Sequence, residues 1–291
     1  MKKSSVLSEK TIKAIKKFIE KKKTEDNLMD QFPNTVLRDD VLEILGLYCT
    51  VVFYPLENEK NNGFHITGIP NRKGIEQHFV FINTAQSAEK QVFTAAHELG
   101  HVWAVDRQIE MEANVSFNSQ ERECVINRFA AELLMPEEHF IKIADSEFRK
   151  YTDENGGLTL LSLLKMVASL MNYFMSPEKA VIKRLGEIGA LDDETVNMLT
   201  NDNSSVESVA VRKIVSDTIA QIVRSNGYTD LQKGSHKKAI KGLQDLLEEA
   251  EAKHSVAQSK IISLRNTFGI SEPESSDKLG EKIDVFTIKG S

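Results

Sequence analysis

The first regular pattern along the chain is a set of apolar residues at helical spacing among lysines. Its successive members lie three, three and one residues apart and fall on one face of a helix: Ile12, Ile15, Phe18 and Ile19. A second helical pattern covers residues 36–45, and Gly46 after it is suited to end a helix. We therefore expect two helices before the first strand.

Between residues 48 and 83 the pattern changes to short runs of β-branched and aromatic residues. The runs cover 48–54, 64–69 and 78–83, with turn-forming residues between them. Short connections favour antiparallel pairing of consecutive strands. We predict a small three-stranded antiparallel sheet, in which the run 78–83 is either an edge strand or an internal strand.

Helical periodicity then dominates the chain. Helices are predicted at 87–105, 120–134, 136–148, 158–173 and 176–188. Ser87 is suited to cap the first of these, and Asn118 and Glu121 have the spacing of a capping box before the second. The polar segment 106–119 is predicted as a connection. The expected fold class is α+β, a mostly helical domain with a small sheet.

The segment 200–208 is rich in Asn, Asp and Ser and is the best candidate for a domain boundary. Beyond it, the helical patterns at 209–223 and 237–264 are charged and contain very few aromatic residues. A last short strand is expected at 284–289. We predict three parts: a basic amphipathic helical segment at 1–30, a central domain at 31–200 and a helical C-terminal region at 201–291.

The composition limits the class of protein. With 41% hydrophobic residues, a chain of 291 residues can bury an ordinary core. It contains no apolar run of about 18 residues, and its lysine-rich start lacks the apolar core of a secretory signal. Cys49 and Cys124 lack the spacing of a disulfide framework or a thiolate metal cluster. We expect a cytoplasmic protein without a membrane partner.

The charge is distributed unevenly. The net charge is −6, yet residues 1–23 contain nine lysines against two glutamates. This basic helix either lays its apolar face on the domain behind it or contacts an acidic partner or nucleic acid, and we favour the first interpretation. Because binding to a phosphate backbone needs a positive face, the acidic remainder predicts no direct binding of nucleic acid.

The sequence His97-Glu98-Leu99-Gly100-His101 is an H-E-x-x-H pattern inside a predicted helix. Histidines four residues apart lie on the same face, so both imidazoles can bind one metal ion, and Glu98 is turned toward the open coordination position. The alternative is a pair of structural histidines with ordinary hydrogen bonds. A catalytic zinc site normally has three protein ligands and a water molecule. We therefore predict a Zn²⁺ site with Glu98 as general base.

The third ligand must come from another element. The predicted helix after the polar segment offers Glu121, Glu123 and Glu132. We expect Glu123, because Asn127 follows it by one helical turn and could bond the outer nitrogen of a zinc-binding histidine. A peptidase would also need a donor to the oxyanion of the transition state. The candidates for this role are His65, His78, His139, Tyr151 and Tyr173.

Residues 97–101, together with the run NRFAAELLMP from Asn127 to Pro136, strongly resemble the ImmA/IrrE family of bacterial and phage metallopeptidases. The later run SPEKA at 176–180, followed by Arg184-Leu185, resembles the closing helix of that family. The resemblance covers about 36–191. Members often have an alanine or a glutamate-alanine pair before the asparagine, where this chain has Val125-Ile126.

The resemblance implies a zinc endopeptidase with a gluzincin-like site, in which the downstream glutamate falls on Glu123. Known members cut helix-turn-helix transcriptional repressors and so release stress or mobile-element genes, which implies a repressor as the protein substrate. Two other hypotheses stay open. The domain could be a zinc-stabilised regulatory module that binds a repressor or toxin partner without cutting it, or a metal hydrolase of non-peptide substrates.

Overall fold

The computed structural model describes residues 7–25, 27–32, 36–58, 61–70, 76–152, 157–200, 206–231 and 234–271. The chain divides into two compact units, Met1–Lys237 and Lys238–Ser291. The α+β prediction is confirmed, since helices predominate and one small sheet is present. The strand expected at 284–289 lies outside the described residues.

The first unit begins with a helical segment and the sheet strands: α1 (Glu9–Glu25), α2 (Leu28–Gln31), α3 (Asp40–Tyr48), β1 (Thr50–Tyr54), β2 (Gly63–Pro70) and β3 (Glu76–Asn83). It continues with α4 (Ala88–Val102), α5 (Val105–Ala113), α6 (Ser119–Leu134), α7 (Glu137–Tyr151), α8 (Leu160–Phe174), α9 (Glu178–Glu187), α10 (Asp193–Thr200), α11 (Val206–Ser225) and the short 3-10 helix η1 (Thr229–Leu231). The second unit contains β4 (Ala239–Ile240), α12 (Leu243–Ala252) and α13 (Gln258–Phe268).

Within the first unit, the sheet is mixed and its strands have the order β2-β3-β1, whereas we expected three antiparallel strands. β2 and β3 are antiparallel, with His65 opposite Val80. β1, however, is parallel to β3, with Val52 opposite Phe81. The expectation was wrong because it assumed that β1 pairs with the next strand in the sequence. β3 is therefore an internal strand, and β2 lies at an edge.

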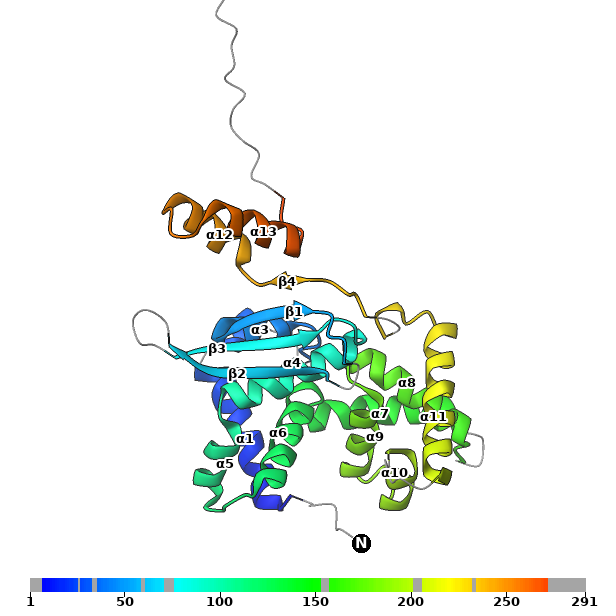
Figure 1. Ribbon diagram of the computed structural model, residues 1–291. Coiled ribbons are helices and arrows are strands. Elements are labelled where there is room, and N and C mark those ends of the chain that lie inside the picture. Colours follow the sequence, from blue (N-terminus) through cyan, green and yellow to red (C-terminus); the bar gives the residue numbers. More distant parts are fainter. Residues whose placement is uncertain are drawn as a thin grey trace, which may run out of the picture. The chain divides into compact units, whose positions relative to one another are not determined.

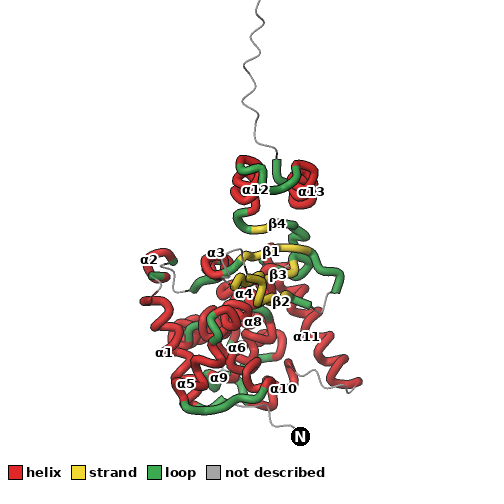
Figure 2. The backbone as a smooth tube through the Cα atoms, turned by 60° about the vertical axis from the view of Figure 1, so that its left-hand side comes forward, coloured by secondary structure: helices red, strands yellow, loops and turns green. Residues whose placement is uncertain are grey.

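One helix, α4, lies directly against the sheet and connects it to the helical layers (Figures 1 and 2). It packs on β2 and β3 on one side and on α6 on the other. Val80 and Ile82 of β3 are fully buried, so the alternating apolar positions of this strand face the core. One face of the sheet thus packs against α4 and fixes the position of this helix.

The N-terminal helix α1 is covered by the same unit. Ile15 and Ile19 are buried, and the helix packs against α5 and α6. Its lysines lie at the rim, where Lys16 forms an ion pair of 2.8 Å with Glu137 of α7. This arrangement agrees with the first interpretation of the basic helix, in which its apolar face lies on the domain behind it.

The predictions for the segment 106–119 and for Gly46 were wrong. The segment predicted as a connection contains α5, whose buried residues Val105, Ile109 and Ala113 recur every four positions. Its polar face misled us, because the acidic groups there pair with Arg122 of α6. Gly46 lies inside α3 instead of ending it.

Other local predictions hold. The side chain of Asn118 accepts a hydrogen bond from the Glu121 backbone N–H, and the Glu121 carboxylate accepts one from the Asn118 N–H, as a capping box requires. Cys49 and Cys124 are half-buried and do not form a disulfide with each other. Within the described ranges, every helix is too short or too polar to cross a bilayer.

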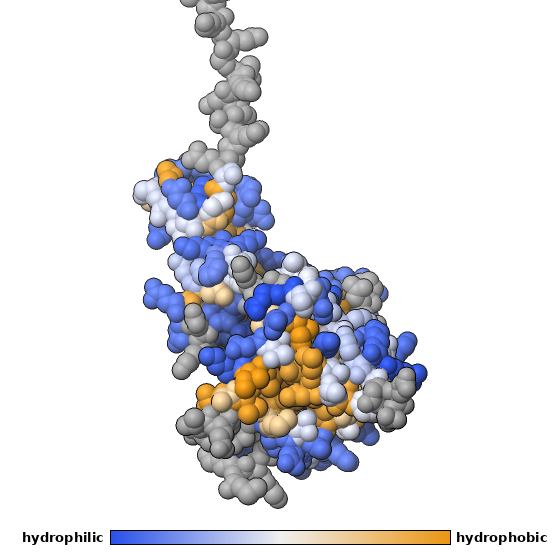
Figure 3. Space-filling model, turned by 90° about the vertical axis from the view of Figure 1, so that its right-hand side faces the viewer, coloured by the Kyte–Doolittle hydropathy of each residue, from blue (hydrophilic) through white to orange (hydrophobic). Residues whose placement is uncertain are grey.

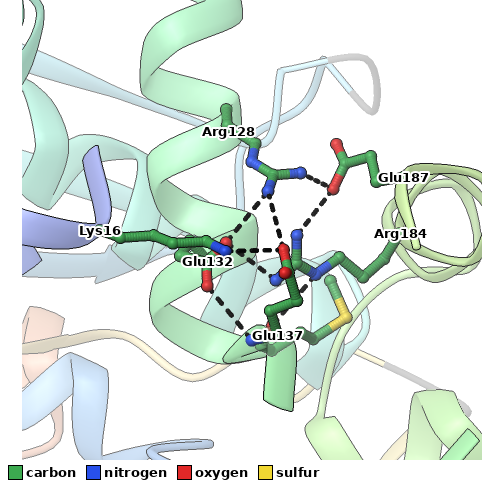
Figure 4. A network of polar contacts seen from close by, with 7 residues as sticks. Lys16, Arg128, Glu132, Glu137, Arg184 and Glu187 are labelled. Carbon is green, nitrogen blue, oxygen red and sulfur yellow. Dashed lines mark hydrogen bonds and ion pairs between the residues drawn. The ribbon is translucent and has the colours of Figure 1, made fainter. Parts of the chain in front are cut away.

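A network of buried charges joins α6 to the helices that follow it (Figure 4). Arg184 has no exposed side-chain surface; it donates to Glu132 at 2.8 Å, to Glu187 at 2.9 Å and to the Met135 carbonyl at 3.1 Å. Arg128 pairs with the same two glutamates. Because each carboxylate is shared by two guanidinium groups, neither arginine can be removed without leaving a buried charge poorly compensated.

The unit also exposes apolar surface. Figure 3 shows a broad hydrophobic area on the face that carries α8 and α11. The large apolar residues that these helices expose are Leu160, Leu161 and Tyr173 of α8 and Val209, Val211 and Ile214 of α11. α8 and α11 pack against each other, so the exposed apolar residues come from two helices that are in contact.

The N-terminus of α4 contains a buried acid. Ser87 is at the predicted N-cap position, but its hydroxyl donates to the Glu89 carboxylate instead of capping the backbone. Glu89 is 4% exposed, and no described group bonds its second carboxylate oxygen. Burial is the largest influence and raises the pKa of this carboxyl above its usual value of 4.5.

We expect Arg184→Ala to lower the free energy of unfolding by about 3–5 kcal/mol, because it leaves Glu132 buried with one arginine fewer. The matched control is Arg149→Ala, whose partner Asp145 is 55% exposed; this loss should stay within about 0.5 kcal/mol. Urea unfolding of both variants measures the difference. Equal effects of the two substitutions would contradict the structural role of the network.

Glu89→Gln tests the buried acid through its pH dependence. A raised pKa means that the folded state binds the proton more tightly than the unfolded chain, so this stability is present below pH 4.5 and is lost as the pH rises through the folded pKa. We expect the variant to have a higher urea midpoint than the wild type at pH 8 and a similar midpoint at pH 4. A difference that does not change with pH would show that the carboxyl is not perturbed.

Candidate metal centre

Helix α4 carries three of the predicted site residues, and its other faces are buried. Ala95, Ala96 and Leu99 have no exposed surface. Gly100 permits close contact with α6, since a Cβ atom at this position would lie 3.0 Å from the Phe129 ring. The absence of a side chain at Gly100 therefore lets α6 bring its own side chains beside the histidine pair.

His97, His101 and Glu123 converge on one point, and each offers one ligand atom. The two histidine Nε2 atoms are 3.2 Å apart. The Glu123 carboxylate oxygens lie 3.5 Å from Nε2 of His97 and 3.7 Å from Nε2 of His101. Two ligand atoms at about 2.1 Å from a tetrahedral zinc ion are about 3.4 Å apart. The three donors are thus spaced as a single cation of this size requires.

Asn127 fixes the orientation of one imidazole. Nδ1–H of His97 donates to the Asn127 side-chain oxygen at 3.1 Å. Nε2 of the neutral ring then carries the lone pair that can bind a metal ion. Burial, and next the charge of His101, lower the pKa of His97. The neutral imidazole is the form that binds a metal ion, so the surroundings already favour the ligand state.

Glu98 lies beside the three donors and is only 7% exposed. Burial first, and the negative charge of Glu123 second, raise the pKa of its carboxyl to about 7. A cation held by the neighbouring donors would act in the opposite direction. Burial thus raises the proton affinity of this carboxyl, and a bound cation would favour its ionised form, which is the form that can accept a proton.

The other two glutamates that we considered as ligands have different partners. Glu121 is engaged in the capping box of α6, and Glu132 is bonded by Arg128 and Arg184. Glu123, in contrast, has a side chain that is 54% exposed, and it faces the histidines. Of the three candidates, the structure brings only this one to the histidine pair.

Two further histidines lie near the centre, on the sheet. Nε2 of His65 on β2 is 3.0 Å from Nδ1 of His78 on β3. Burial, then His78 and His101, lower the pKa of His65 to about 4. The candidates His139 and Tyr173 instead bond each other at 2.9 Å on α7 and α8. The sequence listed His65 but could not single it out, because its position depends on how β2 packs on α4.

Two imidazoles and a carboxylate, with a second carboxylate beside them, form the donor set of a metal-dependent hydrolase of the H-E-x-x-H class. This donor set fits zinc better than calcium or magnesium, which prefer oxygen ligands alone. The fold and the site thus define a protein of the metallopeptidase type.

The comparison with protein families identifies the group within this class. Residues 47–186 match the family model Peptidase_M78, described as the IrrE N-terminal-like domain. These residues therefore belong to the ImmA/IrrE peptidase family, and the resemblance inferred from the sequence is confirmed. The match extends from the end of α3 to α9 and includes every residue of the candidate metal centre. No curated protein matches the chain.

We expect Glu123→Ala to abolish tight zinc binding and Asn127→Ala to weaken it about 10–100-fold, because Asn127 orients a ligand without touching the metal. The control is Glu121→Ala, which removes an acid from the same helix but only breaks its cap. Competition with a chromophoric chelator measures all three affinities. If Glu121→Ala weakened binding as much as Glu123→Ala, the assignment of the third ligand would be wrong.

Proposed function

We propose that the chain is a zinc-dependent endopeptidase that cuts a specific cytoplasmic protein. The observation that carries the proposal is the convergence of His97, His101 and Glu123 beside the buried Glu98. The family match supports a peptidase, and the donor set supports zinc as the metal. Each of these side chains has a separate role in the proposed hydrolysis of a peptide bond.

The roles follow from the positions. Zinc, when bound, would polarise the peptide carbonyl and lower the pKa of a water molecule. His97 and His101 would hold it through neutral nitrogens, and Glu123 would supply the negative ligand. Glu98 would take a proton from the attacking water and deliver it to the leaving amine. Asn127 would keep the His97 ring in place.

The proposed substrate is a helix-turn-helix transcriptional repressor of a stress or mobile-element system, as the family resemblance implies. An extended segment of such a protein could add to the edge of the sheet. The run 78–83, which the sequence left as either an edge or an internal strand, is the internal strand β3. The edge strand beside α4 is β2. Neither nucleic acid nor a membrane is part of the proposal.

The alternative is a regulatory module in which zinc only stabilises the fold. Structural zinc sites normally use four protein ligands, whereas the group found among the described residues has three. A structural site would also not need Glu98, a buried carboxylate whose desolvation is costly. Both features favour the enzyme.

We expect Glu98→Gln to keep its zinc and to lose at least about 10²-fold in the rate of cleavage, because the proton acceptor is gone while the ligands remain. The assay combines metal analysis with incubation against repressors encoded by neighbouring genes, followed by mass spectrometry of the products. Glu89→Gln is the matched control, since it neutralises another buried carboxyl of α4 outside the site.

Two results would count against the proposal. Cleavage by Glu98→Gln at the wild-type rate would refute the role of the general base. A wild-type protein that binds zinc and a repressor, but never yields a cleaved product, would support the regulatory module instead.

A further inference from the structure

The side chains of His65 and His78 lie on the face of the sheet that α4 covers. In β3, His78 is two residues before the fully buried Val80, so both point to the core side. His65 is directly opposite Val80 in the register, and residues opposite each other share a face. Both histidines are therefore directed to the layer that contains the metal centre.

The packing of β2 on α4 shows which part of the helix they face. A Cβ atom on Gly63 would lie 2.7 Å from the Thr94 side chain of α4. His65 is two residues further along β2 on the same face, and His97 is one helical turn beyond Thr94. The charge of His101 also contributes to the lowered pKa of His65, so the two imidazoles lie near each other. These observations place His65 over the part of α4 that bears the histidine pair.

His78 holds the ring of His65 in a defined orientation. The rings are stacked with centroids 5.2 Å apart, and one nitrogen of each is shared in the 3.0 Å contact. When Nδ1–H of His78 donates to Nε2 of His65, the hydrogen of a neutral His65 must sit on Nδ1. In this tautomer, the N–H on Nδ1 of His65 is not used by His78, and the ring is only half-buried.

We infer that His65, oriented by His78, donates a hydrogen bond to the carbonyl oxygen of the bound peptide as its carbon becomes tetrahedral. This inference rests on the proposed peptidase function and adds the oxyanion donor that the sequence could not assign. The location on β2 supports it, because a peptide that pairs with the edge strand passes beside His65. His65 is then a catalytic residue, and His78 is a positioning residue.

A cross-strand pair could instead serve only to stabilise the sheet. The two roles differ in what a substitution changes. A structural pair affects the unfolding free energy and is not restored by a different donor. An oxyanion donor affects kcat with little change in KM, and a side chain that retains an N–H restores part of the rate.

The test compares His65→Phe, which keeps a ring but no donor, with His65→Gln, which keeps an N–H. We expect His65→Phe to retain wild-type zinc content and to lose about 10²–10³-fold in kcat toward a repressor that the wild type cuts. His65→Gln should recover part of this loss. His139→Phe is the matched control, because His139 also bonds an aromatic neighbour, Tyr173, but on α7 and α8, and it should leave kcat unchanged.

A binding measurement separates this inference from the proposed function. Calorimetry with acetohydroxamate, whose carbonyl group mimics that of the substrate at the metal, should show a loss of roughly tenfold in affinity for zinc-loaded His65→Phe. Equal affinity and equal kcat for His65→Phe and the wild type would overturn the role of His65 while leaving the peptidase intact. A wild-type protein that binds neither zinc nor acetohydroxamate would instead refute the metallopeptidase itself.

Discussion

The close contact of α4 with α6 at Gly100 is the constraint on which the candidate site depends. A single added carbon there would press on the side chains of Phe129 and Ile126. The contact brings a histidine pair from one helix within 3.7 Å of a glutamate from the other. Neither helix could bind a metal ion with three ligands alone, because His97 and His101 use the available face of α4.

The buried charges stabilise this geometry from the opposite side of α6. Arg128 follows Asn127 directly in the sequence, and its guanidinium group is held by Glu132 and Glu187. Buried ion pairs contribute little net stability, but they disfavour other arrangements in which one partner is left unpaired. The network therefore limits how α6 can rotate or slide, and with it the position of Glu123, the proposed third ligand.

The compact unit is larger than the family domain. The matched residues are 47–186, yet α1 packs on α5 and α6, and α11 packs on α8. Both helices add apolar contacts to elements of the domain: Ile15 and Ile19 from α1 and Val215 and Ile219 from α11 are buried. The candidate metal centre is thus built from family elements and is supported by helices outside the matched range.

The sequence by itself determined the features that depend on residues close together in the chain. The four-residue spacing of His97 and His101, the capping box at Asn118 and most of the helices follow from the local geometry of the backbone, and the family pattern follows from residue identity. Tertiary structure alone decided the parallel pairing of β1 with β3, the approach of Glu123, which the sequence already favoured as third ligand, to the histidine pair, and the place of His65 beside the site. The physical reason is that these three depend on contacts between elements distant in sequence, whose packing no local spacing specifies.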